Sequence, residues 1–207
     1  MTPPAETACP EILTIGHSNH SPEHFLALLR GAGVTAVADV RSAPYSRHMP
    51  HFSREPLAAL LRKAGVAYVF LGRELGGRPD SRALYSNGSA DYERMACTEA
   101  FRRGLDRVMD GARRHRIALM CSEQDPLDCH RCLLVARRLR ERGHRVGHIL
   151  ADGRIEPHEE SEARLLAAVR MDANDLFASR EERLADAYRT RGRKVAFAEL
   201  EAAGSAA

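Results

Sequence analysis

The residues best suited to chemistry lie together in the segment 121–132, CSEQDPLDCHRC, which contains three thiols, an imidazole and a guanidinium. This segment follows an apolar run at 117–120 and precedes an amphipathic pattern at 129–142. We therefore expect it to join a buried strand to a helix N-terminus. The first turn of a helix presents unpaired N–H groups and a partial positive charge, which lower the pKa of a thiol and also bind anions.

A cysteine nucleophile is the first hypothesis for this segment. Either Cys121 or Cys129 is the reactive thiolate in this hypothesis, because the neighbouring His130 and Arg131 add positive charge that stabilises it. Glu123 and His130 are then the groups that move protons. Arg131, together with an arginine elsewhere in the chain, would bind a negatively charged ligand.

Three alternatives explain the same cysteines differently. Cys121, Cys129, His130 and Cys132 are residue types that ligate zinc or iron, although structural zinc sites normally pair two separated knuckles. Cys129 and Cys132 also form the C-x-x-C pattern of a redox dithiol, but that pattern normally follows the first core strand and here comes late. Finally, Cys121 could be a small buried hydrophobic residue at a strand end, which is the interpretation we prefer for the two remaining cysteines.

Polar side chains also follow the first two apolar runs of the chain. His17 and Ser18 come after the run at 12–15, and Asp39, Arg41 and Ser46 come at and after the run at 34–40. Adjacent residues on a strand point to opposite sides, so we expect His17 and Ser18 to contact a ligand separately rather than as a catalytic pair. Asp39 and Arg41 lie two residues apart on the same side and are expected to form an ion pair.

Short apolar runs alternate with amphipathic segments along the chain. The predicted strands are 12–15, 34–40, 66–71, 117–120 and 146–150, and the predicted helices are 22–31, 56–63, 91–115, 129–142, 159–170 and 179–190. This order predicts an α/β fold with an open, mostly parallel five-stranded sheet and helices on both faces, a Rossmann-like or flavodoxin-like three-layer sandwich with a helical C-terminal extension. Because parallel strands place their carboxyl ends at one edge, the polar residues above should share one pocket.

One α/β domain is expected over residues 12–200, between a frayed N-terminus at 1–11 and a disordered tail at 201–207. A chain of 207 residues is long enough for one large core. The odd number of cysteines, five, and the lack of a secretion-signal pattern at the N-terminus favour reduced thiols and a cytoplasmic protein. Every apolar stretch falls short of the roughly 18 residues of a membrane span, so no membrane association is expected.

The net charge of +3 gives only weak support for binding nucleic acid. The 31 basic and 28 acidic residues are interspersed, and the arginines within 113–116 and 137–142 fall on predicted helices. A solvated helical face explains these arginines better than a phosphate-binding patch does.

Taken together, several of these motifs resemble the bacterial family known as domain of unknown function 488. The resembling segments, between Ile12 and Phe197, are Thr14-Ile-Gly-His-Ser18, Asp39-Val-Arg41 with Pro44 and Ser46, Leu119-Met-Cys-Ser-Glu123, Cys129-His-Arg131, Asp175-Leu-Phe177 and Ala187-Tyr188. The resemblance implies an α/β domain whose shared polar residues form one site: His17, Ser18, Asp39, Arg41, Ser46, Cys121, Glu123, Cys129, His130 and Arg131. The family has no settled activity. Cys132 departs from its usual pattern, which weakens the dithiol and four-ligand metal hypotheses as functions of the whole family.

The leading hypothesis is a cysteine-dependent enzyme that acts on a small anionic or nucleotide-like ligand at the carboxyl edge of the sheet. The expected catalytic residues are Cys121, Glu123, Cys129 and His130, and the expected ligand contacts are His17, Ser18, Asp39, Arg41, Ser46 and Arg131. The alternatives are a non-catalytic module that binds a ligand or nucleic acid, and a zinc or iron site formed by the cysteines. The substrate, the cofactor and the oligomeric state do not follow from the sequence.

Overall fold

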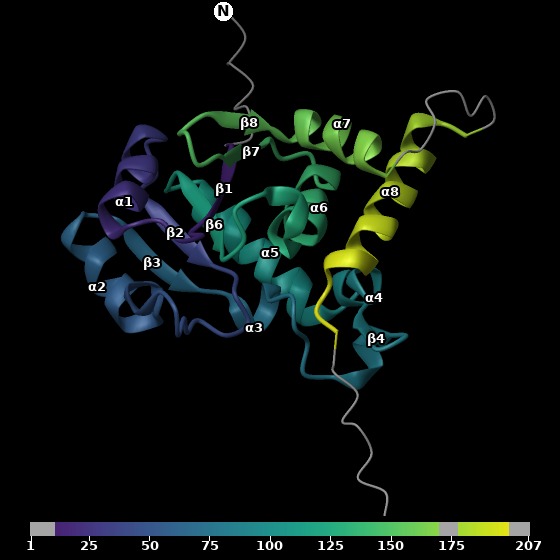
Figure 1. Ribbon diagram of the computed structural model, residues 1–207, viewed down its shortest axis with the longest axis horizontal. Helices are drawn as coiled ribbons and strands as arrows, with labels where there is room; N and C mark the ends of the chain where they lie inside the picture. Colours follow the sequence, from purple (N-terminus) through teal and green to yellow (C-terminus); the bar gives the residue numbers. More distant parts are fainter. Residues whose placement is uncertain (1–10, 170–177, 199–207) are drawn as a thin grey trace, which may run out of the picture.

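A mostly parallel sheet of six strands forms the centre of the molecule (Figure 1). The computed structural model describes residues 11–169 and 178–198, so the expectations for 1–10, for the tail at 201–207 and for the motif at 175–177 lie outside the described residues. The strands follow one another across the sheet in the order β3-β2-β6-β1-β7-β8. Their bounds are Ile12–Gly16 for β1, Ala36–Asp39 for β2, Ala67–Phe70 for β3, Ile117–Cys121 for β6, Val146–Ile149 for β7 and Ile155–Pro157 for β8.

Strands β3, β2, β6, β1 and β7 are parallel, and β8 runs antiparallel to β7 at one edge. The expected mostly parallel α/β sheet is confirmed, but the expected count of five strands is wrong. The additional strand, β8, has only 3 residues, too few to show the alternation of apolar and polar side chains that identifies a strand. Gly153, with a φ of 86°, lies in the turn that reverses the chain between β7 and β8.

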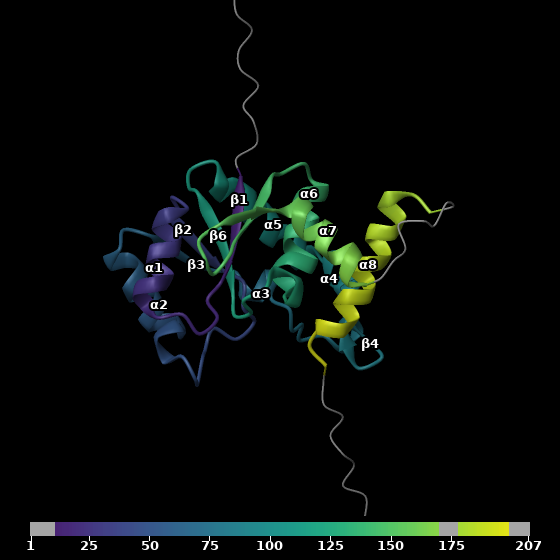
Figure 2. The same ribbon diagram turned by 45° about the horizontal axis from the view of Figure 1, so that its top comes forward.

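The order of the strands differs from the Rossmann and flavodoxin orders, because β6 lies between β1 and β2. The chain passes from β1 through α1 (Pro22–Gly31) to β2, and through α2 (Arg54–Lys63) to β3, on one face of the sheet. It returns through α5 (Glu99–Ala112) to β6, and through α6 (Arg137–Glu141) to β7, on the other face. The chain thus changes both its direction across the sheet and the face that its helices cover, so all crossovers have the same handedness. The result is the three layers seen in Figures 1 and 2.

Alternation along the strands supplies an apolar surface to both helical layers. On β1, Leu13 and Ile15 pack in one cluster with Phe25 of α1, whereas Ile12 belongs to the opposite cluster with Leu139 of α6. The central strands of the sheet are therefore buried on both faces, as is typical of a parallel sheet.

The predicted helices at 91–115 and 129–142 are both interrupted. The first is two helices, α4 (Tyr92–Ala96) and α5, because the Thr98 hydroxyl accepts a hydrogen bond from the Phe101 amide and begins a new helix. The second begins as a π-helix, Arg131–Ala136, which continues into α6. Such wide helical turns are rare and occur frequently at functional sites.

The segment between β3 and α4, which contains no predicted helix or strand, has structure of its own. It includes α3 (Gly72–Leu75), a short 3₁₀ helix at Arg82–Leu84, and a hairpin of β4 (Tyr85–Ser86) and β5 (Ser89–Ala90). The hairpin turns at Asn87 and Gly88, whose φ angles of 52° and 76° are those of the tight turns that Asn-Gly favours.

Two helices follow β8 and pack beside the π-helix in a third apolar cluster: α7 (His158–Ala168) and α8 (Arg180–Val195). A capping box begins α8, since the side chains of Ser179 and Glu182 bond to each other's backbone N–H groups. After α8 the chain meets the hairpin, where the amide of Ala90 donates to the carbonyl oxygen of Phe197. Among the described residues, no helix combines the length and the apolar character needed to cross a bilayer.

Candidate functional site

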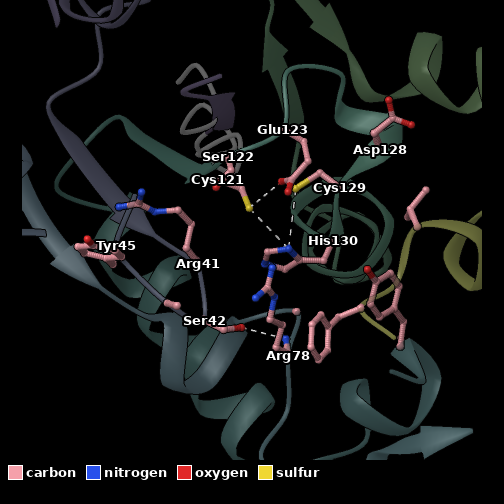
Figure 3. A pocket seen from close by; sticks show the side chains of 15 residues that line it. Arg41, Ser42, Tyr45, Arg78, Cys121, Ser122, Glu123, Asp128, Cys129 and His130 are labelled. Atoms are coloured by element: carbon pink, nitrogen blue, oxygen red, sulfur yellow. Dashed lines mark hydrogen bonds between the residues drawn. The ribbon is translucent and has the colours of Figure 1, made fainter. Parts of the chain in front are cut away.

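A cavity of about 360 Å³ opens beyond the carboxyl ends of β2 and β6 (Figure 3). The loops after these strands, the segment leading into the π-helix and the chain after α8 all contribute to its walls. The residues that line it are Arg41, Ser42, Ala43, Tyr45, Gly77, Arg78, Tyr92, Cys121, Ser122, Glu123, Asp128, Cys129, His130, Val195 and Phe197. The cavity thus lies at the sheet edge where open parallel sheets bind ligands.

Two thiols and one imidazole meet in this cavity. The Sγ atoms of Cys121 and Cys129 lie 3.7 Å and 3.8 Å from Nδ1 of His130. The opposite ring nitrogen, Nε2, lies 2.9 Å from the carbonyl oxygen of Val40, which only accepts hydrogen bonds, so Nε2 carries a proton in both the neutral and the charged ring. The lone pair of Nδ1 then faces both sulfur atoms, where it can accept a proton from either thiol (Figure 3).

The surroundings of Cys129 favour its ionised form. Burial by itself would raise its pKa, but a hydrogen bond from Cys121 and the positive charge of Arg131 place the pKa of Cys129 well below its ordinary value. The same hydrogen bond, together with burial, raises the pKa of Cys121 well above its ordinary value. Burial opposes protonation of His130, yet the negative charge of Cys129 raises the pKa of the ring. Cys129 and His130 therefore favour a thiolate–imidazolium pair, with Cys121 as its protonated neighbour.

Glu123 places a carboxyl group beside the thiols. Its Oε2 lies 3.1 Å from Sγ of Cys121 and is a second acceptor within reach of the single thiol proton of Cys121. Burial of the carboxyl group, followed by the negative charge of Cys129, raises the pKa of Glu123. A raised pKa increases the protonated fraction at neutral pH, which suits this residue to donating a proton.

Arg131 lies entirely beneath the surface, and its guanidinium is used inside the protein. Nη1 donates to the carbonyl oxygen of Glu123 at 2.6 Å, and Nη2 donates to that of Gln124 at 2.9 Å. Its backbone amide donates to Sγ of Cys129 at 3.4 Å. The segment 123–124 approaches so closely that a Cβ on Gly16, at the end of β1, would lie 1.8 Å from the Glu123 carbonyl oxygen. Arg131 therefore shapes the loop and stabilises the thiolate.

A buried ion pair joins Arg41 at the wall of the cavity to Asp39 behind it. Nη2 of Arg41 is 2.6 Å from Oδ2 of Asp39, which also accepts a hydrogen bond from the Tyr68 hydroxyl at 2.8 Å. This confirms the predicted pairing of Asp39 with Arg41. Nη1 of Arg41 donates to Nε2 of His17 at 3.2 Å, while Nδ1 of His17 donates to the carbonyl oxygen of Ser18 at 2.9 Å. Both bonds require a neutral ring, and burial lowers the pKa of His17 to about 4.

Comparison with known proteins identifies the relatives of this chain. The family model described as Domain of unknown function DUF488 matches residues 21–138, more than half of the chain. The chain belongs to this family. The resemblance found in the sequence is thereby confirmed. No curated protein and no solved structure matches the chain at a significant level.

The structure brings eight of the ten expected site residues of this DUF488 protein to the cavity or directly behind its wall. Five of the ten line the cavity: Arg41, Cys121, Glu123, Cys129 and His130. His17, Asp39 and Arg131 are buried behind these side chains and contact them. Ser18 and Ser46 are not among the lining residues. The Ser46 hydroxyl instead accepts a hydrogen bond from the backbone amide three residues later, at 3.0 Å.

Arg78 was not singled out in the sequence, and it extends from the loop after α3 toward His130 (Figure 3). Its backbone amide donates to the Ser42 hydroxyl at 2.9 Å, and its guanidinium lies over the Phe197 ring at 4.5 Å. The sequence feature that could have identified Arg78 is the pair of glycines, Gly76 and Gly77, that precedes it in a long loop. A Cβ on Gly77 would lie 2.8 Å from Cγ of His130, so this close approach requires glycine.

Tyr92 and Phe197 also line the cavity without any local sequence signal. Tyr92 begins α4, and Phe197 follows α8, more than a hundred residues later. Only the packing of α8 against the rest of the fold brings the second of these residues to the site. Both Phe197 and Val195 lie outside the segment matched by the DUF488 model.

The donor atoms of Cys121, Cys129 and His130 lie within 4.8 Å of one another, close enough to share a metal ion. Cys132, the fourth residue of the metal hypothesis, lies elsewhere: its Sγ is 3.8 Å from Nε2 of His148. The structure therefore does not support the four-ligand metal site, because Cys132 groups with His148 and His158.

Proposed function

We propose that this DUF488 protein is a cysteine-dependent enzyme that acts on a small anionic ligand, with Cys129 as the nucleophile. The observation that supports this proposal is the placement of Cys129 between a buried arginine and an imidazole at the wall of an open cavity. The cavity volume, about 360 Å³, lies in the range of small-molecule sites. Nucleophile, proton carrier and charge stabiliser are thus all present within one site.

In the proposed reaction, the Cys129 sulfur forms a bond to an electrophilic atom of the ligand while the bond from that atom to a leaving group breaks. The leaving group takes a proton from the His130 imidazolium or from the Glu123 carboxyl group. Cys121 stabilises the thiolate before attack through its hydrogen bond. Water then releases the ligand from the sulfur, and the group that gave up its proton in the first step, His130 or Glu123, accepts a proton from that water as the base.

Arg78 is the residue that we assign to the negative charge of the ligand. Among the described residues, its guanidinium makes a contact with an aromatic ring but no ion pair. Arg41 is already paired with Asp39, and Asp128 at the cavity wall is paired with Arg191. Arg78 therefore takes the role that the sequence suggested for Arg41 and Arg131.

Nucleic-acid binding has less support from the structure. The arginines at 137, 138, 140 and 142, which suggested a basic patch, all pair with carboxylates: Glu93, Glu141, Glu159 and Asp106. A guanidinium already paired with a carboxylate gains less from a phosphate, so we favour the small ligand.

Iodoacetamide should modify Cys129 rapidly down to a pH well below about 8.5, the pKa of an ordinary thiol. The reason is that only the thiolate reacts, and Arg131 and Cys121 stabilise the thiolate of Cys129. The rate is measured from pH 5 to 9, after removal of metal ions with a chelator, by mass spectrometry of the peptide that contains Cys129. Cys129→Ser should abolish the fast reaction, whereas substitution of the exposed Cys97 should leave it unchanged. An apparent pKa of about 8.5 or higher for both Cys121 and Cys129 would overturn the proposal.

The charge of the ligand is tested with iodoacetate, the anionic counterpart of iodoacetamide. We expect the ratio of the iodoacetate rate to the iodoacetamide rate at Cys129 to exceed the ratio for free cysteine, because Arg78 attracts the anion. Arg78→Gln should lower this ratio on the order of fivefold. The matched control is Arg73→Gln, since Arg73 is exposed and does not line this cavity. Equal ratios in the wild type and Arg78→Gln would show that the site does not select anions through Arg78.

A further inference from the structure

A second cluster of metal-binding residue types lies in the interior, apart from the cavity. Cys132 from the π-helix, His148 from β7 and His158 from the start of α7 are each 0% exposed. Nε2 of His148 lies 2.9 Å from Nδ1 of His158 and 3.8 Å from Sγ of Cys132. All three donor atoms lie within 4.8 Å of one another, and none of these residues lines the cavity that contains Cys129.

The two rings of this cluster are also fixed from their far sides. Nδ1 of His148 lies 2.8 Å from the hydroxyl of Thr14 on β1. Nε2 of His158 lies 2.9 Å from the hydroxyl of Tyr188 on α8, which in turn donates to the carboxylate of Glu162 at 3.4 Å. Metal-binding histidines almost always have such a partner on the nitrogen that does not bind the metal. Both rings therefore have the outer hydrogen bonds of metal ligands.

We propose that Cys132, His148 and His158 bind a zinc ion that links α7 and the π-helix to the sheet. Zinc binds sulfur at about 2.3 Å and nitrogen at about 2.0–2.1 Å, so donors in a tetrahedral site are about 3.3–3.6 Å apart. The two distances from Nε2 of His148, 2.9 Å and 3.8 Å, lie on either side of this range and each needs an adjustment of a few tenths of an ångström, while Nδ1 of His158 and Sγ of Cys132 lie within 4.8 Å of each other. One thiolate and two imidazoles form a donor set that zinc prefers.

The positions of the protons in this cluster are compatible with zinc binding. Because Tyr188 donates its proton onward, it accepts a hydrogen bond from Nε2 of His158, and Nδ1 of that ring has a free lone pair. In the hydrogen-bonded arrangement, this lone pair accepts a proton from Nε2 of His148. On zinc binding, the His148 proton moves to Nδ1, where the Thr14 oxygen accepts it, and the Cys132 thiol releases its proton to solvent. His158 keeps its tautomer.

A hydrogen-bond network without metal explains the two histidines, and Cys132 is then only a packing residue of the third apolar cluster. A thiol is a weak donor, and a separation of 3.8 Å from His148 contributes little to stability. As a zinc ligand, the same sulfur takes part in the strongest interaction of the cluster. His148 and His158 lie outside the residues that the DUF488 model matches, so this site is separate from the proposed reaction of Cys129.

The test uses the full chain with Cys121→Ser and Cys129→Ser, which removes the thiols of the cavity and leaves the second cluster intact. After chelator treatment, this variant should bind one equivalent of Zn²⁺ in a competition titration, and Zn²⁺ should raise its thermal unfolding midpoint. Co²⁺ bound in the same place should give the near-ultraviolet charge-transfer absorption of a cobalt–thiolate bond. Adding Cys132→Ser should weaken Zn²⁺ binding at least about tenfold and abolish that absorption.

The outcomes separate the alternatives. If the variant that retains Cys132 binds neither Zn²⁺ nor Co²⁺, or if binding survives Cys132→Ser, the zinc site does not exist. Binding of Cu⁺ without Zn²⁺ would also overturn the assignment to zinc. Should Cys132→Ser fail to fold, the cobalt–thiolate absorption decides the matter, because Cys132 is the only thiol near the cluster in this variant within the described residues. None of these results depends on whether Cys129 is a nucleophile.

Discussion

Replacing Arg131 with methionine should lower the free energy of unfolding by about 3–5 kcal/mol and raise the pKa of Cys129 toward the ordinary thiol value. Arg131 is 0% exposed and donates to two carbonyl oxygens that have approached it closely. Its removal leaves these acceptors without their donor and takes a positive charge from the thiolate. Urea unfolding measures the first effect, and the pH dependence of alkylation measures the second.

The pH dependence of this loss follows from the direction of the shift at Cys129. A thiol whose pKa is depressed in the folded state contributes stability at and above its unfolded pKa of about 8.5, and this contribution disappears as the pH falls through the folded pKa. The difference in stability between wild type and Arg131→Met should therefore widen as the pH rises toward 8.5.

Two control variants separate the effect of the Arg131 charge from the effect of its buried hydrogen bonds. Arg131→Lys keeps the charge and should retain part of the pKa depression, while losing the paired contacts to the two carbonyls. Arg107→Met removes an arginine from a half-exposed ion pair with Glu74 and should cost about 1 kcal/mol or less. If Arg131→Met unfolded at the same urea concentration as Arg107→Met, Arg131 would not be the support of the loop that we describe.

Asp39→Asn should lower the free energy of unfolding by about 3 kcal/mol or more. Asparagine preserves the size of the side chain but removes its charge, which leaves the buried guanidinium of Arg41 uncompensated. The exposures of Arg41 and Asp39 are 4% and 0%, so water cannot replace the carboxylate. The same change should loosen the hydrogen bond from Arg41 to His17.

Urea unfolding with Glu74→Gln as the control measures this effect. Glu74 pairs with Arg107 in a more exposed setting, so its neutralisation should cost about 1 kcal/mol or less. A loss at Asp39 no greater than the loss at Glu74 would show that the buried pair contributes no more than a surface pair.

Sequence patterns determined most of the strands of the sheet, but not their order across it. The apolar runs that became β1, β2, β6 and β7 are buried on both faces, which makes them continuous and easy to recognise. The Asp39–Arg41 pair was also predictable, because residues two apart on a strand point to the same side. The cap at Ser179 followed from local spacing alone.

The sequence did not predict structural features that depend on only a few residues or on residues far apart in the chain. The three residues of β8 form a strand only because β7 is available to pair with them. The Asn87-Gly88 hairpin had a recognisable turn, but its two-residue strands show no periodicity. The break before α5 depends on one threonine that caps a helix within an otherwise continuous apolar pattern.

For the site, the sequence determined which chemical groups gather at the carboxyl edge, because parallel strands share that edge. Only the tertiary structure decided how they face one another. The Val40 carbonyl sets which nitrogen of His130 faces the thiols, and the π-helix directs Cys132 toward His148 and away from Cys129. Residue spacing governs side-chain direction within one element, whereas contacts between elements depend on strand order and helix packing, which arise from pairing between distant parts of the chain.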